Sequence, residues 1–139
     1  MNIAYRPIGY FKTPFTDIKG MPIQPIGAEH VEGTIEVLPE FGEGLKDLEG
    51  FSHVYVLYHL HQIIGFDLMV KPFLDTQRHG IFATRSPKRP NPIGLSVMRL
   101  KEVRDSSVVL GCVDVLDHTP VIDIKPYVAD FDRCNADRF

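Results

Sequence analysis

The sequence predicts a mainly β domain, a small barrel or sandwich of short strands, on three observations. Eleven prolines and eleven glycines interrupt the 139 residues so often that few windows can hold a helix of ordinary length. Short segments rich in Val, Ile, Phe and Tyr recur along the chain and end at turn residues. A chain of 139 residues with 44% hydrophobic content can bury one core but is short for two.

Eight segments have the composition of strands. They are Ile3–Phe11, Val31–Leu38, Ser52–His61, Phe66–Phe73, His79–Arg85, Gly94–Val103, Ser107–Leu116 and Val121–Tyr127. The polar run Arg104–Ser107 predicts a hairpin turn between two of them. A short helix is expected at Gly44–Glu49, where two leucines lie three residues apart and can face the core. We expect one domain over residues 1–139, in which residues 130–139 form a tail that need not be ordered.

The charges are distributed unevenly. A formal net charge of -3 argues against a protein that binds nucleic acid non-specifically through a wholly basic surface. Positively charged residues gather in the central stretch from Arg78 to Arg104, whereas Glu29–Glu49 is rich in acids. Any anionic ligand is therefore expected to bind the central stretch.

The sequence also indicates a cellular compartment. No segment approaches the roughly 20 apolar residues that span a bilayer, and the N-terminus lacks the apolar run of a secretory signal. Cys112 and Cys134 do not form the pattern of a disulfide framework and are expected to be reduced thiols. We therefore expect a cytoplasmic protein that does not contact a membrane.

The segment Arg85–Gly94 connects two apolar runs and contains three prolines. Each proline fixes its own φ and favours extended geometry in the preceding residue, so part of the loop's conformational entropy is lost before a ligand binds. Arg85, Lys88 and Arg89 place positive charges on this stiff loop, and guanidinium groups bind carboxylate or phosphate and stack on flat bases. The loop is predicted to bind an anionic, nucleotide-like ligand, with a solvated basic turn as the alternative.

A second candidate site begins at Asp114–Pro120, where polar residues interrupt two apolar runs, with Asp123 and Lys125 just beyond. Asp and Thr side chains at a strand exit commonly bind their own backbone as Asx-type turns. The alternative is a nucleoside pocket, in which a carboxylate binds a ribose or amino group and backbone amides bind the adenine edge. The residues leave both alternatives open.

His59 and His61 lie two apart on an expected strand and would face one side of the sheet, a spacing that metal sites on β-barrels can use. No Cys or carboxylate lies at ligand spacing nearby, and the HEXXH, CXXC and EF-hand patterns are missing. No metal site is therefore predicted, and a hydrogen-bonded histidine at a pocket rim beside Gln62 is favoured. A lone Gly-x-Gly precedes no βαβ unit, so a Rossmann cofactor site is not expected.

A long run of the chain, HGIFATRSPKRPNPIGLS at His79–Ser96, resembles the signature of the TrmO-type tRNA methyltransferases, also called TsaA-like proteins. Similar segments occur at Leu48–His53, at His61-Gln62 and at Asp114–Tyr127, so that the resemblance covers nearly all of Ile8–Tyr127. The resemblance implies a small, single-sheet antiparallel β-barrel with one or two short helices. Such proteins bind S-adenosyl-L-methionine without a Rossmann fold and usually form homodimers.

The resemblance also implies a reaction, methyl transfer to N6 of threonylcarbamoyl-adenosine at tRNA position 37, next to the anticodon. The positions implied to contact the cofactor are Gln24, Pro25, Ile26, His61, Gln62, Arg85, Leu95, Leu116, Asp117, His118 and Thr119. Partners expected for the threonylcarbamoyl carboxylate or nearby phosphates of the tRNA are Lys88, Arg89, Asn91 and Lys125. The N6 proton has three candidate acceptors, Asp117, Asp123 and water.

The chain departs from the family pattern at one turn, where Asp117-His118-Thr119-Pro120 replaces Asp-Gly-Thr-Pro. His118 is expected either to adopt positive φ at a modest energetic cost or to form a different turn. The resemblance also implies that the larger bacterial relatives carry a C-terminal extension, which this chain is expected to lack. The expected difference and the acidic net charge are compatible with the alternative function, a non-catalytic regulatory protein that binds S-adenosylmethionine or a nucleotide. A purely structural β-domain would leave the basic loop Arg85–Pro92 without a role.

Overall fold

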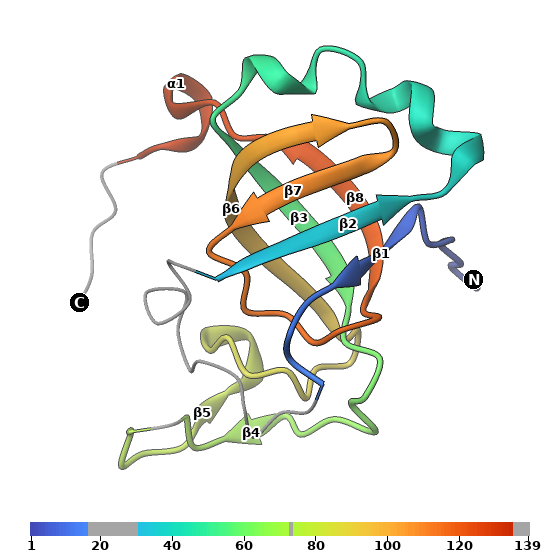
Figure 1. Ribbon diagram of the computed structural model, residues 1–139. Helices are drawn as coiled ribbons and strands as arrows, with labels where there is room; N and C mark the ends of the chain where they lie inside the picture. The colour runs from blue at the N-terminus through green and yellow to red at the C-terminus, as the bar shows by residue number, and fades with distance from the viewer. Residues whose placement is uncertain (17–30, 73, 135–139) are drawn as a thin grey trace.

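The computed structural model describes residues 1–16, 31–72 and 74–134. Its main feature is a closed barrel of antiparallel strands in the order β1, β2, β7, β6, β3, β8 and back to β1 (Figure 1). The barrel strands are β1 (Gly9–Lys12), β2 (Glu32–Val37), β3 (His53–His59), β6 (Ile93–Arg104), β7 (Ser107–Gly111) and β8 (Pro120–Pro126). The predicted mainly β barrel is therefore confirmed.

One face of each strand fills the barrel interior. In β3, Val54, Val56 and Tyr58 are buried and alternate with residues that are half-buried or exposed. The same two-residue period in β2 buries Ile35. The Tyr58 ring packs edge-on against Phe11, with ring centroids 5.8 Å apart and planes at 88°. The apolar ring of Tyr58 thus belongs to the core.

The hairpin between β6 and β7 turns at Asp105 and Ser106, inside the predicted polar run. Asp105 has a φ of 54°, and Asp tolerates this left-handed conformation in a tight turn. The ladder shifts register between Leu100 and Glu102, which places a bulge in the long strand β6. The predicted hairpin is confirmed.

The prediction of two strands is wrong for most of the described residues in each segment. In Phe66–Phe73 only β4 (Met69–Val70) is a strand, and in His79–Arg85 only β5 (His79–Gly80) is, before the 3-10 turn η5 (Ile81–Ala83). These two short strands pair with each other and lie beyond one end of the barrel (Figure 1). Strand-like composition alone does not make these segments into long strands. They lie outside the barrel, so among the described strands each has only the other to pair with.

The expected helix at Gly44–Glu49 is also wrong. Two 3-10 turns occur instead, η3 (Pro39–Leu45) and η4 (Leu48–Gly50). Asp47 lies between them with a φ of 70°, and this left-handed conformation ends a right-handed helix. Both turns lie at the end of the barrel opposite β4 and β5 (Figure 1).

Two strands are shorter than expected. The first begins only at Gly9, although Ile3–Phe11 has strand composition. The strand β7 ends at Gly111, because the left-handed φ of 61° at Cys112 cannot continue the ladder. Residues 112–119 therefore leave the sheet and cross the barrel end that faces β4 and β5 (Figure 1).

The described chain closes with α1 (Ala129–Asp132), a single turn of α-helix within the expected tail. Residues 135–139 of that tail lie outside the described residues. In the described part of the chain, no helix has both the length and the apolar character that crossing a membrane requires.

Candidate functional site

The candidate site lies at the barrel end where the long segment between β3 and β6 meets the loop 112–119 between β7 and β8. Two adjoining clefts open there, of about 1020 Å³ and about 200 Å³. Both are lined by Tyr58, Leu60, Pro87 and Asp114. The larger is also lined by Tyr55, Leu74, Thr84, Arg85, Ser86, Arg89, Ile93, Gly94, Leu95, Ser96 and Val97. The smaller is also lined by His61, Gln62, Ile63, Val115, Leu116 and Thr119.

The basic loop forms one wall of the larger cleft and is held by its own arginines. Arg89 Nη1 donates to the carbonyl oxygens of Thr84 at 2.9 Å and Ser86 at 3.1 Å. Arg85 Nη2 donates to the carbonyl oxygen of Leu95 at 3.2 Å. Each guanidinium has five N–H donors, so both arginines keep donors beyond these contacts. The loop is therefore a folded wall and not a freely solvated turn.

The exposed tip of the loop carries Lys88 and Asn91, which line neither cleft. Their backbones are ordered by hydrogen bonds, since the Asp67 N–H donates to the Lys88 carbonyl at 3.3 Å and the Ile93 N–H donates to the Asn91 carbonyl at 2.7 Å. The structure thus separates the predicted cofactor residue Arg85, which lines the larger cleft, from these predicted substrate residues on the loop surface.

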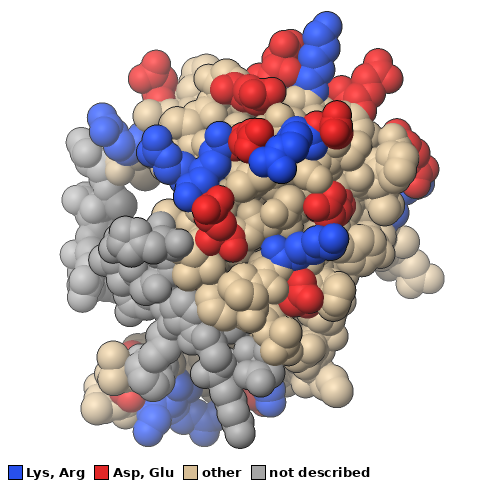
Figure 2. Space-filling view, in the orientation of Figure 1, with Lys and Arg blue, Asp and Glu red and all other residues tan. Residues whose placement is uncertain are grey.

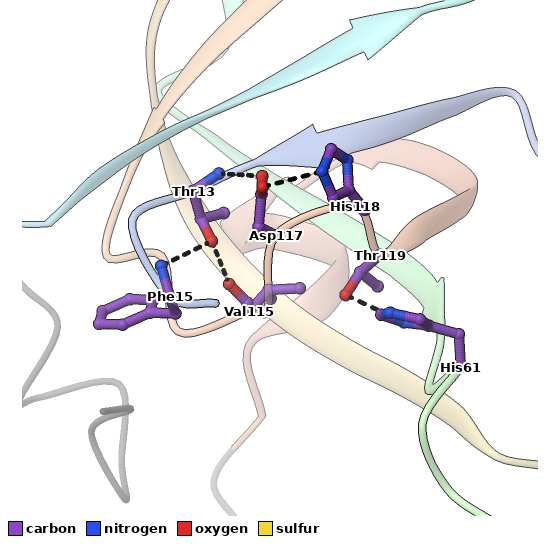
Figure 3. Close-up of polar contacts among 7 residues, drawn as sticks. All are labelled: Thr13, Phe15, His61, Val115, Asp117, His118 and Thr119. Atoms are coloured by element: carbon purple, nitrogen blue, oxygen red, sulfur yellow. Dashed lines mark hydrogen bonds and ion pairs between the residues drawn. The ribbon is translucent and has the colours of Figure 1, made fainter. Parts of the chain in front are cut away.

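The smaller cleft brings together His61, Gln62, Leu116 and Thr119, four of the predicted cofactor residues. His61 Nδ1 and Thr119 Oγ1 lie 3.5 Å apart (Figure 3), and Thr119 is buried. The lining is mostly apolar, with a histidine and an amide at its rim. This is the histidine at a pocket rim that the sequence favoured.

The predicted strand position of His61 is wrong. The strand β3 ends at His59, and His61 lies in the following turn. The two histidines therefore do not share one face of a strand. Among the residues that the structure describes, no group of three or more His, Cys, Asp or Glu side chains can hold a metal ion.

Asp117 anchors a turn outside the clefts (Figure 3). Its Oδ1 accepts a hydrogen bond from the Thr13 N–H at 3.0 Å, and its Oδ2 lies 3.1 Å from His118 Nε2. Thr13 also donates from Oγ1 to the Val115 carbonyl at 2.7 Å and accepts from the Phe15 N–H at 3.2 Å. His118 has a φ of 67° and also lines neither cleft. Of the two conformations expected for His118, the structure contains the one with positive φ.

Asp123 and Lys125 lie on β8 and line neither cleft. Asp123 Oδ1 accepts from the neighbouring Ile124 N–H at 2.9 Å, and its Oδ2 lies 3.1 Å from Lys125 Nζ. The predicted cofactor residues Gln24, Pro25 and Ile26 lie outside the described residues. Of the predicted site, the clefts therefore unite Arg85, Arg89 and Leu95 with the four residues of the smaller cleft.

The sequence of residues 10–133 matches the family described as the tRNA-methyltransferase O N-terminal domain. The chain belongs to this family. A probable S-adenosyl-L-methionine-binding protein of Pyrococcus abyssi is 52% identical over 132 residues, which are 95% of this chain and 72% of that protein. A tRNA (adenine(37)-N6)-methyltransferase of Mus musculus is 39% identical over 140 residues, covering 94% of this chain and 32% of that protein.

A crystal structure of TrmO matches with a TM-score of 0.85 at 41% sequence identity. The match covers 100% of this chain and 64% of the TrmO chain. The resemblance to TrmO-type proteins that the motifs indicated is therefore confirmed. This chain spans less than two thirds of the TrmO chain and about a third of the mouse protein.

In this TrmO-family domain, the sequence pointed to no individual role for Tyr58 or Ser96, and it placed Asp114 only within the second candidate segment, Asp114–Pro120. Tyr58 Oη and Ser96 Oγ lie 2.8 Å apart and share a hydrogen bond inside the larger cleft. Burial raises the pKa of Tyr58, while its bond to Ser96 opposes this rise. One signal was available: the two-residue period of β3 places Tyr58 on the same face as Val54 and Val56.

Asp114 has the least satisfied side chain of this site. Its Oδ1 is buried and has no hydrogen-bond partner in the described part of the chain. Among the described residues, no other buried side-chain oxygen or nitrogen lacks a partner. Burial raises the pKa of the Asp114 carboxyl, and a bond from its own backbone N–H opposes the rise. No sequence pattern separates Asp114 from Asp117, because both stand in the same polar segment.

Proposed function

We propose that this chain is an S-adenosylmethionine-dependent methyltransferase that acts on N6 of threonylcarbamoyl-adenosine at tRNA position 37. One observation carries the proposal. Predicted cofactor residues from three distant parts of the sequence converge on two adjoining clefts at one end of the barrel. They are His61, Gln62, Arg85, Leu95, Leu116 and Thr119.

The clefts fit this cofactor in size and chemistry. Small-molecule pockets usually measure about 300–1,000 Å³ and combine apolar walls with a few polar groups. Leu60, Pro87 and Leu95 offer apolar surface to an adenine ring, and Arg85 offers donors to the carboxylate of the amino-acid part. The Pyrococcus abyssi relative, described as an S-adenosyl-L-methionine-binding protein, supports the same cofactor.

The cofactor, when bound, supplies a methyl group that its sulfonium has already activated. The residues of the chain therefore have to orient the acceptor nitrogen and exclude water. Arg89 ties the carbonyls of Thr84 and Ser86 together, so this wall of the cleft is built before a substrate arrives. Pro87, which lines both clefts, continues the wall between them.

The tRNA is proposed to bind along the exposed tip of the basic loop. Lys88 and Asn91 are exposed there and can reach phosphates or the threonylcarbamoyl carboxylate. On the barrel face formed by β1, β2 and β7, by contrast, positive and negative side chains are interspersed (Figure 2), and Lys101 lies 3.7 Å from Glu32. The mouse relative, a tRNA (adenine(37)-N6)-methyltransferase, supports adenine N6 as the acceptor. Such a substrate would place the protein in the cytoplasm.

The proposal is tested by incubating the protein with cofactor labelled in the methyl group and with tRNA from two cell strains. One strain makes the threonylcarbamoyl modification and the other lacks it. We expect label only in tRNA from the first strain, at the modified adenosine after nuclease digestion. Equal labelling of both pools would contradict the threonylcarbamoyl substrate, and absence of label from both would contradict the methyltransferase.

A second candidate is a regulatory protein that binds the cofactor without transferring its methyl group. The description of the Pyrococcus abyssi relative favours it, because that description names binding alone. Calorimetry with the cofactor separates the two candidates when combined with the labelling experiment. Binding in the micromolar range without transfer to either tRNA pool would identify the regulatory protein.

We also propose that two copies of the chain associate through the outer face of β6, so that the partner copy covers the side of the larger cleft lined by Ile93, Leu95 and Val97. Ile93, Leu95 and Val97 alternate along this strand with inward residues and are 40%, 46% and 40% exposed. A row of exposed apolar side chains is typical of a protein–protein contact. Sedimentation equilibrium should give the mass of two chains; the mass of one chain at micromolar concentration would contradict the homodimer.

A further inference from the structure

We infer that Asp114 is the catalytic base that accepts the N6 proton of the substrate during methyl transfer. The inference rests on the proposed function and names a residue for a step that the sequence assigned to Asp117, Asp123 or water. It begins from a polar atom that the fold leaves unused. Asp114 Oδ1 is buried and has no hydrogen-bond partner among the described residues.

An orphaned carboxylate oxygen is costly in a folded protein. A buried polar group without a partner destabilises the fold by about 1–3 kcal/mol, and more when it is charged. A ligand in the cleft or an ordered water can supply the partner that such a group lacks. Asp114 lines both clefts, so it stands where the cofactor cleft and its neighbour meet.

The other two carboxylates that were candidates are already engaged. Asp117 binds the Thr13 N–H and His118, and Asp123 binds the Ile124 N–H and Lys125. Neither lines a cleft. Among the described residues, Asp114 is thus the carboxylate that lines the clefts and has an oxygen without a hydrogen-bond partner.

The substrate nitrogen needs such a base. A carbamoyl group on N6 delocalises the nitrogen lone pair, so the neutral N–H form is a poor nucleophile toward a methyl group. Removing the proton as the new bond forms restores that lone pair. A general base is most effective when its pKa lies near the operating pH, and burial moves the pKa of Asp114 upward, in that direction.

The step balances without a further reactant. The N6 lone pair forms the N–CH₃ bond, and the electron pair of the S–CH₃ bond stays on sulfur as the positive charge of the sulfonium is lost. The N6 proton moves to the Asp114 carboxylate, and the electrons of the N–H bond remain on nitrogen. One carboxylate and one sulfonium are thereby converted into a neutral acid and a neutral thioether.

The test compares Asp114→Asn with wild type in single-turnover methylation of threonylcarbamoyl-modified tRNA. Asparagine keeps the shape of the side chain but cannot take the proton at neutral pH. We expect the rate to fall by about 10²–10⁴-fold, while the dissociation constant of the cofactor changes less than about threefold. Glu102→Gln is the matched control, because Glu102 pairs with Arg104 at 2.7 Å on the protein surface and lines neither cleft.

Wild-type transfer with an equally fast Asp114→Asn variant would overturn the inference while the proposed function stands. Loss of cofactor affinity in parallel with the rate would also overturn it, because Asp114 would then be a cofactor ligand. A wild type that transfers no methyl group would instead overturn the proposed function. Thermal denaturation of each variant verifies that it is folded before its rate is measured.

A second measurement uses the wild type and does not depend on the folding of a variant. The single-turnover rate should fall as the pH decreases and Asp114 becomes protonated. The other titratable or charged side chains that line the clefts are Tyr55, Tyr58, His61, Arg85 and Arg89. If His61→Gln abolishes the acid limb, the limb belongs to histidine and the inference is overturned. If the limb persists in that variant, the inference is supported.

Discussion

The loop 112–119 between β7 and β8 contains two aspartates, Asp114 and Asp117, whose carboxylates differ in how many hydrogen-bond partners they have. Toward the barrel end, Asp114 is partly buried, lines both clefts and has an acceptor oxygen without a partner. Three residues later, Asp117 is tied by one oxygen to the Thr13 N–H and by the other to His118 (Figure 3). The same residue type therefore serves the fold at one position and stays available for chemistry at the other.

The availability of a carboxylate near a cleft therefore depends on the hydrogen bonds that its oxygens already accept. A carboxylate whose oxygens are bound stabilises the chain that it connects, and here it connects Thr13, the residue after β1, to a loop 104 residues away. A carboxylate left without a partner stores an unfavourable energy that a ligand can relieve. Substitutions at the clefts and substitutions in the turn at Asp117 should therefore change the stability of the protein by different amounts and in different directions.

The largest loss of stability is expected from Gly94→Ala on the cleft side. An added Cβ would lie 2.5 Å from Tyr58 Cζ, so the ring would have to move away from Phe11 and Ser96. Overpacking of this kind lowers the free energy of unfolding by about 1–3 kcal/mol, and urea denaturation measures it. Gly80→Ala is the control, since its added Cβ meets no atom within 4 Å. Equal stability of the two variants would show that the Tyr58 ring does not rest on Gly94.

A smaller loss is expected from Asp117→Ala on the turn side. Removing the carboxylate leaves the Thr13 N–H without its acceptor and should lower the free energy of unfolding by about 1–2 kcal/mol. Asp123→Ala is the comparison, because its contacts are to the adjacent residue and to exposed Lys125, and it should cost at most about 0.5 kcal/mol. If urea denaturation gives the same loss of unfolding free energy for both variants, the hydrogen bond between Thr13 and Asp117 contributes no more to stability than the local contacts of Asp123.

The smallest effect, and of opposite sign, is expected from Asp114→Asn. Burial raises the pKa of Asp114 in the folded protein, so ionisation of this group opposes folding. Its contribution to stability is present below the ordinary aspartate pKa of 3.8 and is lost as the pH rises through the folded-state pKa. Asp114→Asn should therefore raise Tm by about 2 °C at neutral pH, with no gain below that ordinary pKa. A lower Tm at neutral pH would show that the carboxylate is satisfied in the fold.

Much of the fold follows from local sequence. The composition of Val31–Leu38 and Ser52–His61 predicts strands, which the structure contains as β2 and β3, and the polar run Arg104–Ser107 predicts the hairpin. The expected strand in Phe66–Phe73 and the helix at Gly44–Glu49 failed for different reasons. The expected strand lies outside the barrel, where β4 pairs with β5 alone and only two of its residues form a ladder. The expected helix is interrupted by the left-handed backbone of Asp47.

Composition, residue period and proline geometry act over a few residues, so they suffice to predict a small β protein with a stiff basic loop. Its long signature, HGIFATRSPKRPNPIGLS, also sufficed to indicate the TrmO family. Which polar residues meet depends on the tertiary structure, because these contacts join residues that are far apart in the sequence. Asp114 and Asp117 stand in one segment, and what separates them is whether a partner such as Thr13, distant in sequence, folds back to bind them.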